Sequence, residues 1–150
     1  MILLASSRVA HEFFFFQRLV GWALLVWGLG TVAIGTATQL SKNPFFRQFG
    51  LQSLVWGAIN GGIALFSLRG AQAKFALHSD PRNEAGRFRV IVAVNAALDV
   101  GYIAGGLAAL HGARGKPQRA GLGLGIIIQG LFLMLFDLVL VALSGRYTKQ

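Results

Sequence analysis

Four long apolar stretches constrain the fold of this chain more than any other feature. They cover about residues 19–40, 51–68, 90–110 and 121–143; the first two carry no charged residue and the other two carry one aspartate each. An α-helix needs roughly 20 apolar residues to cross the hydrocarbon core of a bilayer. In lipid a spanning segment must satisfy its own backbone hydrogen bonds, and a helix does so. The sequence therefore predicts one all-α membrane domain over residues 1–150, built as a bundle of four transmembrane helices.

The overall charge of the chain agrees with a membrane protein better than with a nucleic-acid-binding protein. Only 13% of the residues are charged, against roughly a quarter in a soluble domain. The net charge is +9, but the basic residues stand in short clusters between the apolar stretches. Such clusters are typical of membrane-flanking residues that contact anionic headgroups. We therefore expect the lipid bilayer, and no nucleic acid, as a partner.

The connections between the apolar stretches contain all three prolines of the chain. Pro44, Pro81 and Pro117 each fall in a different connection, and proline is disfavoured in helix interiors. This supports the division into four helices independently of hydropathy. Asp80 followed by Pro81 has the pattern of a helix N-cap, which predicts that the third helix begins before its apolar stretch.

The two ends of the chain bear on topology. Residues 1–18 are expected to form an interfacial lead-in, with the aromatic run 13–16 at the level of the headgroups. The stretch 19–40 could instead be a cleaved signal peptide, but its length favours a retained helix. Nine of the 14 Lys and Arg, Arg146 and Lys149 among them, fall on the side of the termini. This excess predicts that both termini are cytoplasmic, with dual or inverted insertion as the alternative.

Six polar side chains lie inside the predicted spans. With 1.5 Å of rise per residue, they fall at three matched depths: Asn95 with Asp137, Asp99 with Asn60, and Tyr102 with Gln129. No Lys or Arg lies within a span to neutralise either aspartate. One interpretation is that these residues join the helices through hydrogen bonds. The other is a proton or ion site in a transport pathway, because ionisable groups inside a membrane are costly and commonly functional.

Glycine pairs spaced four residues apart mark three of the spans. Such pairs allow close approach of helix backbones, and we expect them to form either packing contacts within the bundle or a face for a partner. They are Gly57 and Gly61, Gly101 and Gly105, and Gly121 and Gly125.

Other signatures of catalysis or cofactor binding are missing from the spans. All three histidines lie at or beyond a span end, which disfavours a haem held within the chain. The stretch 121–125 superficially resembles a dinucleotide-binding loop but opens a membrane helix. The chain has no cysteine, and no nucleophile and base stand at a shared depth. We therefore expect neither an enzyme nor a metal or cofactor.

The chain resembles a family of small, uncharacterised bacterial membrane proteins with four helices, a domain of unknown function. The resemblance covers about residues 19–143 and depends on three motifs: Trp56-Gly57-x-x-Asn60, Asn95-x-x-Leu98-Asp99-x-x-Tyr102, and Gly125-x-x-x-Gln129-Gly130-x-Phe132-Leu133-x-x-x-Asp137. It implies a four-span bundle in a bacterial cytoplasmic (inner) membrane, and a histidine in relatives where this chain has Gln52. It implies no established activity.

Two functional hypotheses follow. The first is a small transporter-like or channel-like protein, oligomeric because four short helices enclose little room, with Asp99 as a proton or cation site. The second is a non-catalytic accessory or assembly subunit of a larger membrane complex, or a homo-oligomer, that docks through the Gly101 and Gly105 face of the third helix.

Overall fold

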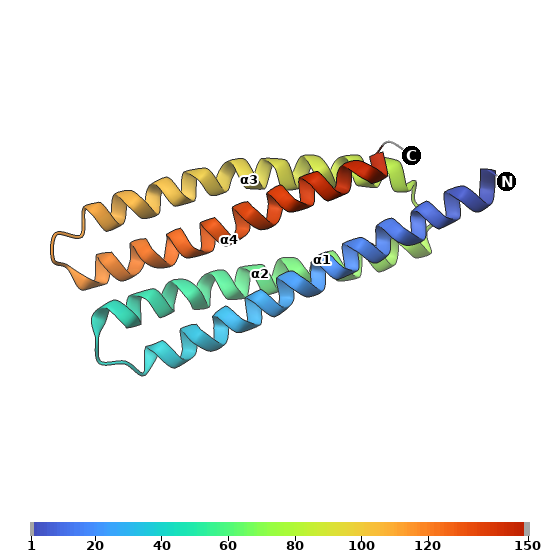
Figure 1. Cartoon of the computed structure of the whole chain (residues 1–150). Helices are drawn as coiled ribbons and strands as arrows, with labels where there is room; N and C mark the ends of the chain where they lie inside the picture. Colours follow the sequence, from blue (N-terminus) through green and yellow to red (C-terminus); the bar gives the residue numbers. More distant parts are fainter. Residues whose placement is uncertain (1, 149–150) are drawn as a thin grey trace.

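The computed structural model describes the backbone of residues 2–148 and the side chains of residues 8–148. It consists of four helices, α1 (Ile2–Gln39), α2 (Pro44–Ala76), α3 (Pro81–His111) and α4 (Pro117–Thr148), joined by short turns (Figure 1). Each helix is long and apolar enough to cross a membrane. The described part of the chain contains no strand. The predicted all-α fold with four membrane-spanning helices is confirmed.

The helix starts follow the proline and N-cap signals. Proline is the first residue of α2, α3 and α4, where its missing N–H costs nothing. The Asn43 carboxamide accepts a hydrogen bond from the Phe45 N–H at 2.9 Å, and the Asp80 carboxylate accepts one from the Arg82 N–H at 3.1 Å. The helix ends therefore lie beyond the apolar stretches, because local capping rather than hydropathy decides where a helix begins.

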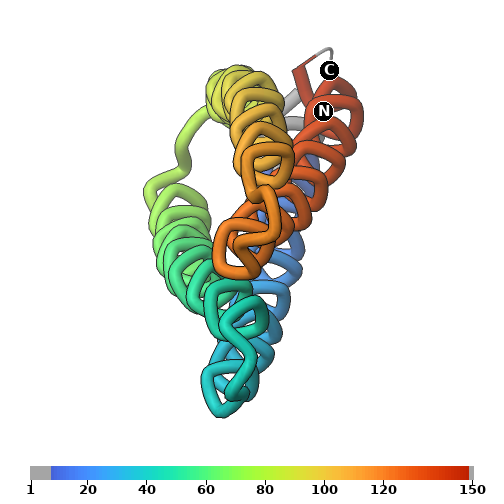
Figure 2. The backbone as a smooth tube through the Cα atoms, turned by 90° about the vertical axis from the view of Figure 1, so that its left-hand side faces the viewer, coloured from blue at the N-terminus to red at the C-terminus, as the bar shows by residue number. Residues whose placement is uncertain are grey.

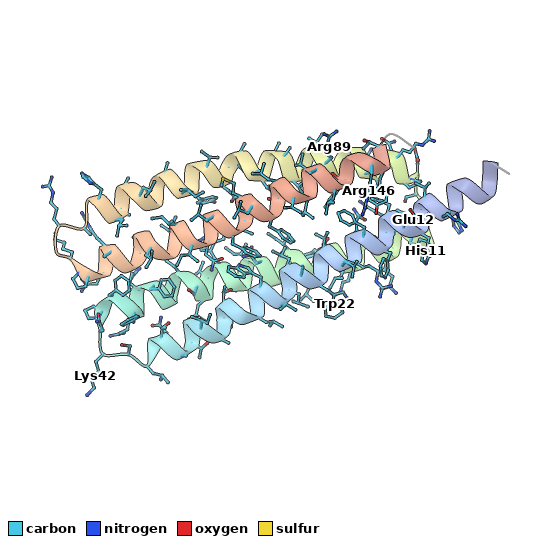
Figure 3. All side chains as sticks on the ribbon, viewed as in Figure 1. His11, Glu12, Trp22, Lys42, Arg89 and Arg146 are labelled. Atoms are coloured by element: carbon cyan, nitrogen blue, oxygen red, sulfur yellow. The ribbon has the colours of Figure 1, made fainter. Side chains whose placement is uncertain are left out.

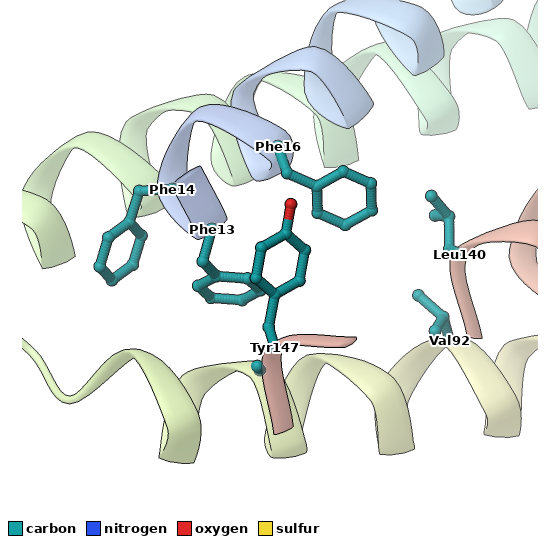
Figure 4. Packing of buried hydrophobic residues seen from close by; sticks show 7 residues of the cluster. Phe13, Phe14, Phe16, Val92, Leu140 and Tyr147 are labelled. Carbon is teal, nitrogen blue, oxygen red and sulfur yellow. The ribbon is translucent and has the colours of Figure 1, made fainter. Parts of the chain in front are cut away.

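The first helix includes both the predicted lead-in and the predicted first span. It runs unbroken from Ile2 to Gln39. Phe13, Phe14 and Phe16 are buried in the main hydrophobic cluster, with Val92 and Leu140 (Figure 4). Because α3 and α4 are also longer than their apolar stretches, Phe88 of α3 and Tyr147 of α4 reach the Phe13 ring.

The C-terminal turn of α4 closes the same aromatic cluster. The Tyr147 ring lies 5.4 Å from that of Phe13 and 5.6 Å from that of Phe16. The Arg146 guanidinium stands 4.8 Å above the Tyr147 ring, within the range of a cation–π contact. Lys149, counted in the charge bias, lies outside the described residues.

The helices form two hairpins, α1 with α2 and α3 with α4, which meet mainly through α2 and α4. Figures 1 and 2 show the two hairpins side by side, with both termini at the end opposite the α1–α2 and α3–α4 turns. Charges concentrate at the ends: Lys42 lies in the α1–α2 turn, while Arg89 and Arg146 lie toward the other end (Figure 3). Large apolar side chains are exposed on every helix, as expected for lipid contact: Val26, Leu29, Phe66, Val90 and Leu135.

Candidate functional site

A cavity of about 200 Å³ lies between α2, α3 and α4 and gathers most of the predicted polar residues. Its polar lining consists of Asn60 from α2, Asn95, Asp99 and Tyr102 from α3, and Asp137 from α4. The structure thus brings together five of the six polar residues that the sequence indicated. Two of the three matched depths, Asn95 with Asp137 and Asp99 with Asn60, correspond to residues that share this cavity.

The deepest polar side chains of the cavity are Asn60 and Asp99. Their exposed fractions are 2% and 4%, and that of Asp137 is 7%. The Asn60 Nδ2 and Asp99 Oδ2 atoms have no hydrogen-bond partner among the described residues. Buried polar atoms are normally paired, and a bare donor or acceptor in a low-dielectric interior is costly. The Asn60 amide therefore offers a free donor to this cavity, and the Asp99 carboxyl offers a free acceptor.

The charged residues that line the cavity are both acidic. Asp99 and Asp137 both line it, and within the described chain no Lys, Arg or His does so. A buried carboxylate usually lies against a basic side chain or a bound cation. A proton on a carboxyl, or a positively charged ligand, would supply the missing partner here.

The rim of the cavity is formed by Tyr102 and Asn95, both more exposed than the aspartates. The Tyr102 side chain is 45% exposed, and its ring meets that of Trp56 edge to face with the centroids 4.9 Å apart. Trp56 also lines the cavity. The motif Trp56-Gly57-x-x-Asn60 on α2 thus places an aromatic wall and a buried amide on one side of the cavity.

Gln129 is the polar residue that the structure separates from the others. Its Oε1 atom accepts a hydrogen bond from the Trp27 indole at 3.1 Å, and the Trp27 ring stacks on Phe132 at 3.6 Å. Gln129 therefore faces α1, and the expected pairing with Tyr102 does not form. The reason is that the position of a residue along a helix does not determine its direction around the helix axis.

A larger groove of about 490 Å³ continues from the cavity toward the end that holds both termini. Asn95 and Asp137 line both spaces, together with Leu24, Ile63 and Phe136. Apart from these polar residues, the middle of the groove is mainly apolar. It gives the cavity an approach from one end of the bundle.

The mouth of the groove carries an ionic cluster that sequence reasoning missed. Lys74, in the last turn of α2, forms an ion pair with Glu84, in the first turn of α3. Arg87 Nη1 lies 3.8 Å from the second Glu84 oxygen. A basic residue at a helix C-terminus and an acidic one at an N-terminus both suit the helix dipole. A basic residue before the predicted turn and an acidic residue after it, within residues 69–89, were the sequence features that could have predicted this ion pair.

In the other half of the bundle, glycines bring α4 close to both α2 and α3. A Cβ atom on Gly123 would lie 2.7 Å from the Gly106 carbonyl, and one on Gly125 would lie 2.8 Å from the Gln52 Cβ. A Cβ on Gly121 would collide with the Phe45 carbonyl oxygen. Only glycine permits such backbone approach. Beyond the cavity, α4 therefore packs closely on α2 and on α3, whereas the groove lies on the other side of the cavity.

The remaining predicted glycines divide between the interior and the surface. Gly57 packs on the Gly28 carbonyl of α1, and the Gly61 backbone lies opposite Gly28. Gly101 and Gly105 are exposed, and a Cβ on either would meet nothing within 4 Å. Of the three predicted pairs, only Gly101 and Gly105 have no neighbouring described helix within reach of a Cβ atom at either glycine.

Comparison with curated proteins and with solved structures finds no match. One family model does match, over residues 23–138. This range includes all three motifs that carry the polar cavity residues, and it covers more than half of the chain. The expected family of unknown function is therefore confirmed: the chain belongs to the DUF6992 family, a family of unknown function.

Proposed function

We propose that this protein is a small transporter-like or channel-like membrane protein, in which a proton or a small solute reaches Asp99 through the groove. The observation that carries the proposal is the cavity itself: two buried carboxyl groups without a basic partner, joined to a groove that leads to one end of the bundle. Ionisable residues inside membrane spans commonly mark such pathways.

The asymmetry of the bundle supports a pathway that is open toward one side. The groove approaches the cavity from the end with the termini, whereas in the opposite half glycine contacts pack α4 closely against α2 and α3. A transporter that exposes its site to one side at a time has this form. Release to the other side would require α2, α3 and α4 to separate at those contacts.

Access of water to the cavity can be tested directly because the chain has no cysteine. We expect a cysteine at Asn60 (N60C), which lines the cavity, to react with a charged, membrane-impermeant thiol reagent in a bilayer. Ala58→Cys is the matched control, since Ala58 is exposed on α2 only about 3 Å of helix rise away. It faces lipid, where the reactive thiolate does not form. Equal labelling of both variants, or labelling of neither, would contradict a hydrated pathway.

Flux is the second test. Proteoliposomes loaded with a pH-sensitive dye and given a membrane potential should take up protons faster than empty liposomes, and Asp99→Asn and Asp137→Asn should abolish the difference. Asp80→Asn makes the same chemical change at an N-cap, where Asn serves as well as Asp, and should leave the flux unchanged. If neither protons nor small cations move, or if the two cavity variants transport normally, the proposal fails.

A second candidate function is that of an assembly subunit or homo-oligomer, and the outward Gly101 and Gly105 face favours it. The other two predicted glycine pairs take part in backbone contacts within the bundle, but this one lacks such a contact. If a second helix packs there, Gly101→Leu and Gly105→Leu should dissociate the complex in mild detergent. Gly62→Leu, at another glycine with nothing within 4 Å, is the control. A wild-type protein that is recovered only as a monomer would contradict this candidate.

A further inference from the structure

We infer that the cavity around Asp99 is a binding site for a small protonated amine. The inference rests on the proposed function, because it names the class of solute that the pathway would carry. It depends on three features of the cavity: its unpaired hydrogen-bonding atoms, the character of its walls and its size.

The hydrogen-bonding atoms of the cavity fit an ammonium group. The Asp99 Oδ2 atom is a buried acceptor without a donor, and Asp137 adds a second carboxyl to the same space. An alkylammonium ion carries up to three N–H donors on one positive charge. Its single charge would balance an ionised Asp99 carboxylate, and a proton on the Asp137 carboxyl would keep the occupied site neutral. The free Asn60 Nδ2 donor is left for an acceptor atom elsewhere on the ligand.

The walls of the cavity favour an organic cation over a metal ion. Hard metal cations require a shell made almost entirely of oxygen atoms, whereas Leu98, Leu133 and Phe136 line much of this space. Trp56 and Tyr102 stand edge to face at its rim with the ring centroids 4.9 Å apart. Aromatic faces attract organic cations and also accept their methylene groups.

The volume of the cavity limits the ligand to a small molecule. About 200 Å³ is available, and an engineered protein cavity of about 150 Å³ holds one benzene molecule. The site would therefore take an amine of about five to ten non-hydrogen atoms. A longer apolar tail would extend into the adjoining groove, which shares Ile63 and Phe136 with the cavity.

The test compares two probes of nearly equal shape, butylammonium and neutral 1-butanol, on the full chain purified in detergent. Trp56 lines the cavity, so its fluorescence reports occupancy, and Trp56→Phe shows which part of the signal comes from it. We expect saturable binding of butylammonium. The affinity for 1-butanol should be at least about tenfold lower, because a hydrogen bond to a charged group accounts for a difference of that size.

Asp99→Asn keeps the size of the side chain and removes its charge, and it should weaken butylammonium binding about tenfold or more. Asp80→Asn should bind as the wild type does. Since Asp99→Asn could disturb folding, Asp137→Asn is measured in parallel, and both variants must keep the wild-type elution volume and helical circular dichroism. Equal affinity of the wild type for the two probes, or unchanged butylammonium binding in both folded variants, would overturn the inference.

The results separate this inference from the proposed function. Proton flux that depends on Asp99, combined with no preference for butylammonium over 1-butanol, would support the transport pathway and refute the amine-binding site. Selective butylammonium binding without flux of protons or butylammonium would support the amine-binding site and refute the transport function.

Discussion

Replacement of Gly28 by alanine should separate α1 from α2 and destabilise the bundle. In the structure, a Cβ atom on Gly28 would lie 2.8 Å from the Gly61 nitrogen, 2.9 Å from the Gly57 carbonyl oxygen and 3.2 Å from the Gly61 Cα. All three are backbone atoms and cannot rotate away as the end of a side chain can. Gly61→Ala is the matched control in the same helix pair, since a Cβ there meets nothing within 4 Å.

The size of the effect follows from these distances. Ordinary van der Waals contact begins at 3.4 Å, so α1 must move by roughly half an ångström along the closest contact. Overpacking of this kind costs about 1–3 kcal/mol. Alanine has a higher helix propensity than glycine by about 1 kcal/mol, but this gain is small where separated helices remain helical in the membrane. We expect Gly28→Ala to lose about 1–3 kcal/mol and Gly61→Ala to stay within about 0.5 kcal/mol of the wild type.

The measurement is unfolding of the purified protein in mixed detergent micelles of rising SDS fraction. It is followed by the fluorescence of the tryptophans, one of which, Trp27, adjoins Gly28. The order of midpoints should be Gly28→Ala below Gly61→Ala, with the latter close to the wild type. If Gly28→Ala is as stable as Gly61→Ala, then α1 and α2 do not approach each other at Gly28 as closely as the structure indicates.

Three further substitutions follow from the packing and can be measured by the same SDS titration. Phe13→Ala empties a fully buried position of the aromatic cluster and should cost about 3–5 kcal/mol; a loss below 1 kcal/mol would contradict that burial. Gln129→Leu removes the acceptor of the Trp27 indole and should cost about 0.6–1.7 kcal/mol, and adding Trp27→Phe should then cost less than it does alone. Lys74→Met breaks the ion pair with Glu84, but the lysine side chain is 44% exposed, so the loss should stay below about 1 kcal/mol and shrink further in high salt.

The positions of the helices could be predicted from the sequence because they depend on local properties. The long uncharged stretches, one proline in each connection and the Asp80 N-cap all act within a few residues of themselves. The length of α1 could not be predicted in this way. The aromatic residues of its first half look interfacial in isolation, and only contact with Phe88 of α3 and Tyr147 of α4 buries them.

The cavity was predictable in part. Asn60, Asp99 and Asp137 stood out because polar groups in apolar stretches must find partners, and depth along the helices placed them near one another. Gln129 stood out for the same reason, yet it bonds to Trp27 on the opposite side of α4. The ionic cluster at the mouth of the groove was missed because Lys74 and Glu84 belong to different helices, and their pairing depends on how α2 and α3 approach.

The sequence by itself therefore determined that the chain has four helices long and apolar enough to cross a membrane, roughly where each lies, and which buried polar groups require partners. The tertiary structure alone decided which way each helix faces. The physical reason is that lipid and protein core are both apolar. A membrane helix does not need the apolar stripe that marks the inner face of a soluble helix. Rotation about each axis is fixed instead by close glycine contacts and interhelical hydrogen bonds, and these turn Asp99 toward Asn60 and Asp137 and leave Gly101 and Gly105 facing outward.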